Sequence, residues 1–263
     1  MTKRRIIALL TDFGLEDGYV GVMKGIIGDI APDTNVIDIS HQIFPQNIDQ
    51  AAYLLWSAYR YFPPETIFVC VVDPGVGSSR NILCAQIARY YFLVPDNGVL
   101  KFILGDAALR HCVRVSNSRF MSEDASDTFH GRDIFAPAAA HLARGVDLKQ
   151  LGPVTSPDSH AENFIDLHDG HNTKITARVI HIDHFGNLIT NIKIPKNRKP
   201  LMIARVKSRS ISTFARCYEE AGPKRPFMTR GSNGLLEIAI KNGNAAGSLR
   251  VRIGERIHVG LLK

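Results

Sequence analysis

The sequence predicts an α/β domain, with a mostly parallel sheet and helices on both of its faces, followed by a small all-β, barrel-like domain. In residues 1–150, short apolar runs alternate with longer segments whose apolar residues recur at helical spacing. A polar stretch with two prolines follows at 152–172, and beyond it short alternating segments are separated by Gly, Pro and Asn. We therefore expect domains at residues 1–165 and 173–263.

The elements of the first domain follow from these patterns. Strands are expected where apolar runs are short and rich in β-branched or aromatic residues, at 6–11, 36–39, 66–72, 82–87 and 90–94. Helices are expected where apolar residues return every three or four positions, at 19–30, 48–61 and 133–143. Asn47 is suited to cap the second helix, since its side chain can accept a hydrogen bond from the first turn.

The second domain shows shorter, alternating segments. We expect strands at 176–182, 201–206, 235–240, 249–253 and 256–259. Because turn residues separate them at short intervals, a compact barrel or sandwich is predicted.

Composition narrows the class of protein. At 263 residues and 45% hydrophobic, the chain can bury a real core. The first apolar run ends at Thr11, which is too short for a signal peptide, and no run is long enough to cross a membrane. We expect a cytoplasmic protein. The four cysteines form no CxxC pair, which favours buried, reduced thiols at Cys70, Cys84, Cys112 and Cys217.

Charge is distributed unevenly. Residues 1–173 carry 14 Lys and Arg against 20 Asp and Glu, a net −6, whereas residues 174–263 carry 18 against 5, a net +13. The basic runs at 193–200 and 205–209 could bind nucleic acid, and attraction between acidic and basic halves of neighbouring subunits explains the same pattern. No aromatic residues accompany the runs, so a nucleic-acid partner is not expected.

Polar residues follow several predicted strands, where open α/β sheets bind ligands. Asp12 could accept both hydroxyls of a ribose, or it could be a simple turn residue. Asp73 begins a tight Pro-Gly-Val-Gly loop, and Arg80 could fold back onto it, either in a site or as an ordinary ion pair at a strand edge. His130 precedes a predicted helix and could move or orient a proton, although loop histidines are more often structural.

Two other chemistries are disfavoured. The Gly-Val-Gly segment at 75–77 has neither phosphate-loop nor dinucleotide-binding spacing. His181 and His184 have an HxxH spacing, but on a strand they would point to opposite faces. We expect no metal.

Taken in order, the motifs resemble the S-adenosyl-L-methionine (SAM) hydroxide adenosyltransferases, or SAM hydrolases, the hydrolytic relatives of the fluorinase and chlorinase. The resemblance covers nearly the whole chain. It rests on TDFGxxDxYVG (11–21), DPGVGSxR (73–80), PDNG (95–98), FHGRDIFAPAAA (129–140), IDxFGNxxTN (182–191), SNGLLEIA (232–239) and GNAA (243–246).

The resemblance implies a metal-independent, cofactor-free enzyme that hydrolyses SAM to adenosine and L-methionine. It implies Asp73, Arg80 and His130 as the catalytic residues that hold and activate water. It also implies a homotrimer with active sites between subunits. For the substrate, it implies that Asp12 binds the ribose and that Asp17, Asp183 and Ser232 bind the methionine half. Near the adenine it implies Asn187, Asn244, Ala245 and Ala246.

The alternatives are a halogenase of the same family and a nucleic-acid-binding module that uses the basic half. The halide-using relatives in the family that this chain resembles bind their ion in a dry pocket of small hydroxyl-bearing and apolar groups, whereas this chain places charge and protons at Asp73 and His130. Water is therefore the expected nucleophile. SAM carries a sulfonium that leaves as a neutral thioether, so the reaction needs an aligned nucleophile and no general acid.

Overall fold

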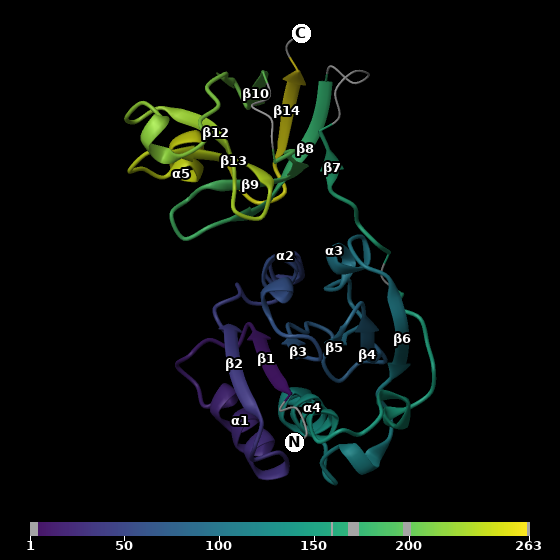
Figure 1. The fold of residues 1–263 in the computed structure, drawn as a ribbon. Helices are drawn as coiled ribbons and strands as arrows, with labels where there is room; N and C mark the ends of the chain where they lie inside the picture. The colour runs from purple at the N-terminus through teal and green to yellow at the C-terminus, as the bar shows by residue number, and fades with distance from the viewer. Residues whose placement is uncertain (1–4, 159, 168–173, 197–200, 262–263) are drawn as a thin grey trace. The chain divides into compact units, whose positions relative to one another are not determined.

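The computed structural model describes residues 5–158, 160–167, 174–196 and 201–261. They form two compact units, Met1–Asn163 and Phe164–Lys263, here called the first and second units (Figure 1). Asp169 in the expected linker and the end of the basic run at 193–200 lie outside the described residues.

The first unit is built on a six-stranded sheet in the order β2-β1-β3-β5-β4-β6. Its strands are β1 (Ile6–Thr11), β2 (Asn35–Ser40), β3 (Ile67–Val71), β4 (Ile82–Ile87), β5 (Tyr90–Pro95) and β6 (Leu109–Arg114). Strands β2, β1, β3 and β5 pair in parallel, but β4 is antiparallel to both of its neighbours. The sheet is therefore mixed rather than simply parallel. Only two residues, Ala88 and Arg89, separate β4 from β5, and such a connection closes a hairpin.

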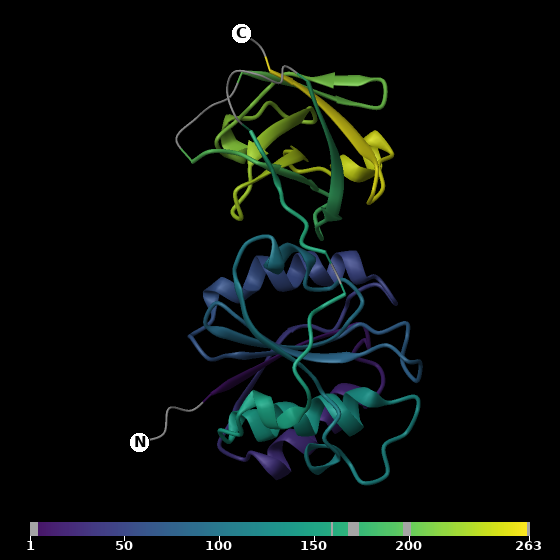
Figure 2. The same cartoon turned by 90° about the vertical axis from the view of Figure 1, so that its right-hand side faces the viewer.

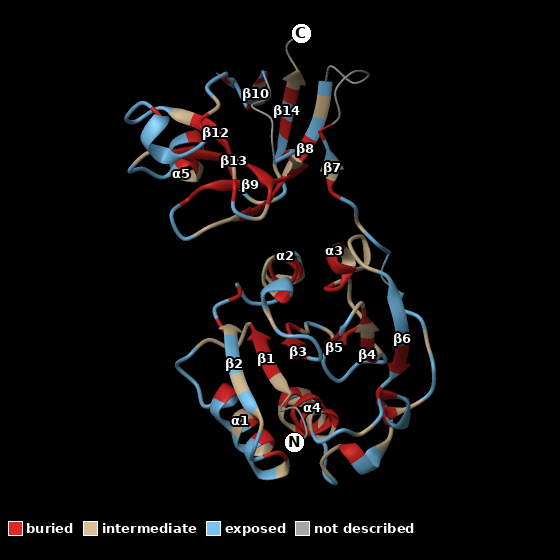
Figure 3. Cartoon of the chain, viewed as in Figure 1, coloured by how far each residue is buried: buried red, intermediate tan, exposed pale blue. Residues whose placement is uncertain are grey.

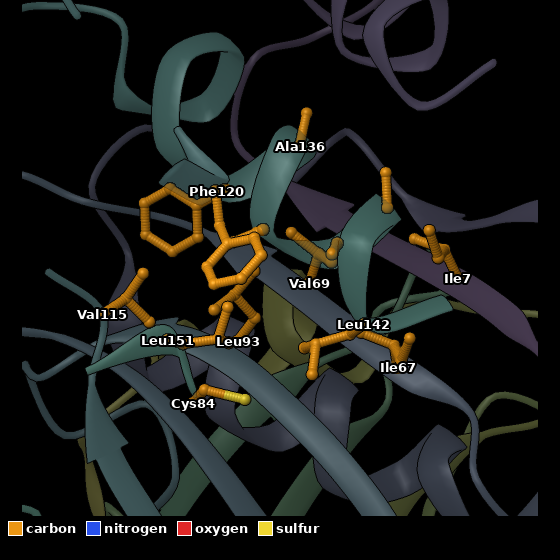
Figure 4. Close-up of a cluster of buried hydrophobic side chains, with 14 of the residues drawn as sticks. Ile7, Ile67, Val69, Cys84, Leu93, Val115, Phe120, Ala136, Leu142 and Leu151 are labelled. Atoms are coloured by element: carbon orange, nitrogen blue, oxygen red, sulfur yellow. The ribbon is translucent and has the colours of Figure 1, made fainter. Parts of the chain in front are cut away.

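Helices lie on both sides of this sheet, as Figure 2 shows for α2 (Ile48–Ala58) on one face and α1 (Tyr19–Ile30) with α4 (Ala136–Ala143) on the other. The central strands are buried along their length (Figure 3). Figure 4 shows the core between the sheet and α4, where Val69 and Leu93 of the sheet lie near Leu142. A short helix α3 (Lys101–Leu104) precedes β6.

Local capping explains where α2 begins. The Asn47 side chain accepts a hydrogen bond from the Gln50 amide at 2.9 Å, which confirms the expected cap of α2. The helix expected to begin at Asp133 instead begins two residues earlier, as a π-helical turn over Gly131–Phe135 that runs directly into α4.

The second unit is a nearly closed, barrel-like sheet with the path β11-β10-β14-β8-β9-β13-β12, antiparallel along its length. A bridge between Phe214 and Met228 links the two ends of this path. The strands are β8 (Lys174–Ile182), β9 (Leu188–Lys193), β10 (Met202–Val206), β11 (Arg209–Ile211), β12 (Pro226–Arg230), β13 (Leu235–Ile240) and β14 (Arg256–Leu261), with β7 (Ile165–Asp166) beside β9.

The strand predicted at 249–253 is wrong. This region contains the end of a short helix, α5 (Ala245–Leu249), and then Arg250 with a left-handed backbone (φ 54°). Leu249 and Val251 are both buried although the backbone here is not a strand. Their spacing of two residues is the same as that of buried residues on one face of a strand, which led to the wrong prediction.

All four cysteines are free thiols; Cys70, Cys84 and Cys112 are buried, whereas Cys217 is exposed. In the part of the chain that the structure describes, no helix is long and apolar enough to cross a membrane.

Candidate active site

Two carboxylates follow neighbouring strands of the first unit at the point where the chain changes direction across the sheet. Thr11 pairs with Val71, so Asp12 and Asp73 begin loops at adjacent carboxyl ends of β1 and β3. From β1 the chain continues to β2 on one side, and β3 lies on the other. Ligands of open α/β sheets bind at such a switch point.

Asp73 and Arg80 form a buried, two-pronged ion pair in the loop between β3 and β4. The Arg80 Nε lies 2.8 Å from each Asp73 carboxylate oxygen, and Nη2 also donates to Oδ2. The Asp73 side chain is 4% exposed and that of Arg80 12%. The pair is thus not an exposed strand-edge contact, and its guanidinium is held in one orientation.

The turn between these residues needs its glycines. Gly77 has φ +77°, and a Cβ there would lie 2.6 Å from the backbone oxygen of Asp127. A Cβ on Gly75 would lie 3.3 Å from the Arg80 side chain. Glycine therefore lets the turn pack against Arg80 and against the segment that leads to His130.

His130 completes the cluster. Its Nδ1 lies 2.9 Å from Arg80 Nη2, and because a guanidinium only donates, Nδ1 must accept. Neutral His130 then carries its proton on Nε2. Burial, followed by the positive charge of Arg80, lowers the pKa of His130 below its usual value, with Asp73, Asp127 and Asp133 opposing. The imidazole is accordingly neutral at pH 7.

Packing links the His130 segment to the loop after β1. Phe129 makes edge contacts with Phe13 and Tyr19, with ring centroids 5.8 and 5.0 Å apart. A Cβ on Gly131 would lie between 3.1 and 3.3 Å from Phe129, Phe13 and Met23. These contacts fix the backbone on either side of His130 and therefore the position of its side chain.

Asp12 is held across the sheet edge rather than in a local turn. Its Oδ2 accepts the Gln46 amide at 2.7 Å. In the motif at 95–98, Asn97 donates to the Val72 carbonyl at 2.9 Å and so holds the residue before Asp73. Asp17 is exposed, just before α1.

The second unit gathers three of the other expected residues around a cavity of about 800 Å³, which Asp183, Asn187 and Ser232 all line. The Asn187 Nδ2 donates to Asp183 Oδ2 at 2.8 Å and to the Tyr218 hydroxyl at 3.0 Å. Asp183 Oδ1 accepts the Asn187 amide at 2.8 Å.

The remaining three expected residues lie behind the 183–187 turn. Asn244 caps α5 by accepting the Gly247 amide at 2.6 Å, and Ala246 donates to the Gly186 carbonyl at 2.9 Å. Ala245 is fully buried. These residues support the turn and do not line the cavity.

Most of the other lining residues were missed from the sequence, among them Tyr218 and Glu237. The signal for Glu237 was present, since it is the one charged residue in the apolar run LLEIAI. Tyr218 had no comparable signal, because it begins a short 3-10 helix between β11 and β12, outside the predicted strands.

The fold and these sites define a two-domain protein whose α/β unit carries a buried Asp-Arg-His cluster and whose barrel-like unit carries a polar cavity. Models of the SAM hydroxide adenosyltransferase N-terminal and C-terminal domains match residues 7–152 and 177–258. The chain belongs to the SAM hydroxide adenosyltransferase family.

Individual relatives agree with this assignment. The chain is 36% identical to the (R)-S-adenosyl-L-methionine hydrolase of Methanocaldococcus jannaschii, covering 97% of this chain and 95% of the relative. It is 26% identical to the fluorinase of Nocardia brasiliensis over 72% of each chain. The crystal structure of an uncharacterized conserved protein from Thermotoga maritima superposes with a TM-score of 0.87 at 33% identity, covering 97% of this chain and 99% of that one.

Proposed function

We propose that this chain hydrolyses SAM to adenosine and L-methionine, using Asp73, Arg80 and His130. The observation that carries the proposal is the Arg80 guanidinium, held between the Asp73 carboxylate and His130 Nδ1 with little exposure. The family membership supports the choice of substrate.

In the reaction, a water oxygen forms a bond to C5′ as the C5′–S bond breaks, and the bonding pair stays on sulfur as the methionine thioether. Arg80 stabilises the negative charge that develops on the oxygen as its proton is lost to solvent. His130 orients that oxygen through Nε2–H, and Asp73 keeps Arg80 in place. The chemistry requires no cofactor or metal, because the leaving group departs uncharged.

Substrate binding extends the proposal to the other expected residues. Asp12 accepts the ribose hydroxyls, Asp17, Asp183 and Ser232 bind the methionine half, and Asn187 with the 244–246 segment lies near the adenine. The homotrimer implied by the resemblance remains a prediction, which light scattering coupled to gel filtration would test.

Product analysis is the direct test. Incubation with SAM in ¹⁸O-labelled water should release adenosine and L-methionine in equal amounts, with the label in the 5′-hydroxyl. The same incubation with chloride or fluoride added should give no 5′-halogenated adenosine. A folded protein that produces halide adducts, or that binds SAM without turnover, would contradict the proposal.

A polyanion is a second candidate ligand, for the outer face of the second unit. Arg178 on β8 lies directly opposite Arg256 on β14, and Arg205 on β10 lies opposite His258. These pairings bring basic side chains of β8, β10 and β14 together, and clustered cations attract phosphate groups. The test is retention on a polynucleotide column, where binding should fall steeply with salt. Salt-independent elution would reject this candidate and leave SAM hydrolysis as the only proposal.

A further inference from the structure

One carboxyl group in the cavity of the second unit has no role in the reaction proposed above. Glu237 lies on β13 between Leu236 and Ile238, both fully buried. Those two side chains belong to the core of the barrel, so alternation along the strand places Glu237 on the opposite face. There it lines the cavity together with Asp183 and Ser232.

The backbone is shaped around this carboxyl group. A Cβ on Gly231 would lie 1.7 Å from Glu237 Oε1, so no residue larger than glycine fits at this position without displacing the acid. Gly231 directly precedes Ser232, and the same loop therefore presents both residues to the cavity.

The carboxyl group is also left without a partner. Across the described ranges, no hydrogen bond or ion pair to Glu237 is formed by the protein. The two arginines of the cavity wall are engaged elsewhere, because Arg230 donates to the Ile194 carbonyl at 2.9 Å and Arg216 pairs with Glu220 at 2.7 Å. A half-buried acid without a partner is costly, and a cationic ligand would remove that cost.

Electrostatics point to the same kind of ligand. Burial, and then the nearby negative charge of Asp183, raise the pKa of Glu237 to about 7. A positive group between the two carboxylates would favour the ionised form of both. The cavity is thus suited to a cation that can contact two carboxylates at once.

We propose that Glu237, together with Asp183, binds the α-ammonium group of the methionine half of SAM. This inference rests on the proposed function. SAM carries two positive groups, but only the ammonium has hydrogen atoms to donate, and its three donors can serve both carboxylates. The sulfonium has none. Glu237 is therefore a specificity residue that distinguishes amino-acid thioethers and sulfonium compounds from analogues without the amino group.

Steady-state kinetics give the first test. Glu237→Gln keeps the shape that fits against Gly231 and removes the charge, so KM for SAM should rise about tenfold or more while kcat changes little. Glu237→Asp should restore part of the affinity. The matched control is Glu219→Gln, a neutralised glutamate of the same unit that is 84% exposed and pairs with Lys241. A KM equal to that of the control would overturn the inference.

A binding measurement separates this inference from the proposed function, because it needs no turnover. Calorimetry would compare L-methionine with 4-(methylthio)butanoate, the same thioether acid without the amino group. The parent should prefer L-methionine by about tenfold or more, and Glu237→Gln should lose that preference. If Glu237→Gln retains the preference, or the parent has none, the inference is wrong. If the preference depends on Glu237 but SAM is not hydrolysed, only the proposed function is wrong.

Discussion

Replacing Asp73 with alanine removes the carboxylate that holds Arg80, while the guanidinium stays in a site where its side chain is only 12% exposed. Breaking a buried ion pair from one side costs about 3–5 kcal/mol, because the remaining charge is both desolvated and unpaired. The first unit spans 163 residues. For this size about 1 kcal/mol lowers Tm by about 2–4 °C, so we expect a loss of about 6–20 °C.

The double variant Asp73→Ala/Arg80→Ala tests whether the loss of stability comes from the unpaired Arg80 guanidinium. Removing both charges leaves no unpaired guanidinium, so the double variant should melt above Asp73→Ala even though it carries one substitution more. The control is Asp49→Ala, which breaks the ion pair with Lys101 in the same unit. Asp49 is 53% exposed, and its loss should cost about 1 kcal/mol or less.

Thermal melts of the full chain, followed by calorimetry, would measure five proteins: the parent, Asp73→Ala, Arg80→Ala, the double variant and Asp49→Ala. Activity would be measured alongside, and both Asp73 variants should lose turnover. Two results would refute the reasoning. In one, Asp73→Ala melts like Asp49→Ala. In the other, the double variant loses the sum of the two single losses, which would mean that Asp73 and Arg80 do not interact.

Three further predictions follow from the geometry. His130→Asn should lower kcat for SAM about a hundredfold with little change in KM. Because the pKa of His130 is lowered, the parent should lose activity only below pH 6.5. An acid midpoint above that value in the pH–rate profile of the parent contradicts the assignment. Gly186→Ala should lower the free energy of unfolding by about 1–2 kcal/mol or more, since Gly186 has φ +83° and a Cβ there would lie 2.3 Å from Asn244. Urea titrations would measure the loss, and an unchanged midpoint of unfolding argues against this packing. Glu237 has a pKa of about 7 against 4.5 for a free glutamate, so the folded chain holds the extra proton and stability should fall as pH rises between those values. That loss, up to about 3 kcal/mol, should be absent in Glu237→Gln, and equal slopes for both proteins would exclude the raised pKa.

Much of the first unit was predictable because its elements are long and their periodicity is strong. The helix at 19–30 has the predicted bounds, and the strands at 6–11 and 82–87 match as well. The prediction of a mostly parallel sheet did not specify which strand runs against the others, and that strand is β4. Direction depends on the connection, and the two-residue link at 88–89 between the strands at 82–87 and 90–94 should have indicated an antiparallel hairpin.

In the second unit, short apolar spacings were ambiguous. Leu249 and Val251 are two residues apart, as in a strand, yet Leu249 ends a helix that Asn244 caps. Strands β7, β9, β11 and β12 of this unit, and β6 of the first unit, were not expected at all. Strand β6 has exposed residues at four of its six positions, so it shows no strong apolar pattern in sequence.

The cluster itself could be proposed from sequence only through the family pattern. Asp73 and Arg80 are seven residues apart, and their contact depends on a turn whose conformation spacing alone does not reveal. His130 is fifty residues from Arg80, and the aromatic packing of Phe129 that directs it is a tertiary feature. Glu237 is a single acid in an apolar strand, and its place beside Asp183 depends on the tertiary packing of the barrel-like sheet.

The π-helical turn that follows His130 helps to set the direction of this side chain. In this turn the Ala136 amide bonds to the Gly131 carbonyl, five residues back, where an α-helix would bond four back. The segment thus holds one residue more than an α-helix of the same rise. Deleting that residue would keep the downstream helix but rotate His130 by about 100° around the axis, away from Arg80. The length of segment 131–135, as well as the identity of its residues, therefore sets the direction of this histidine.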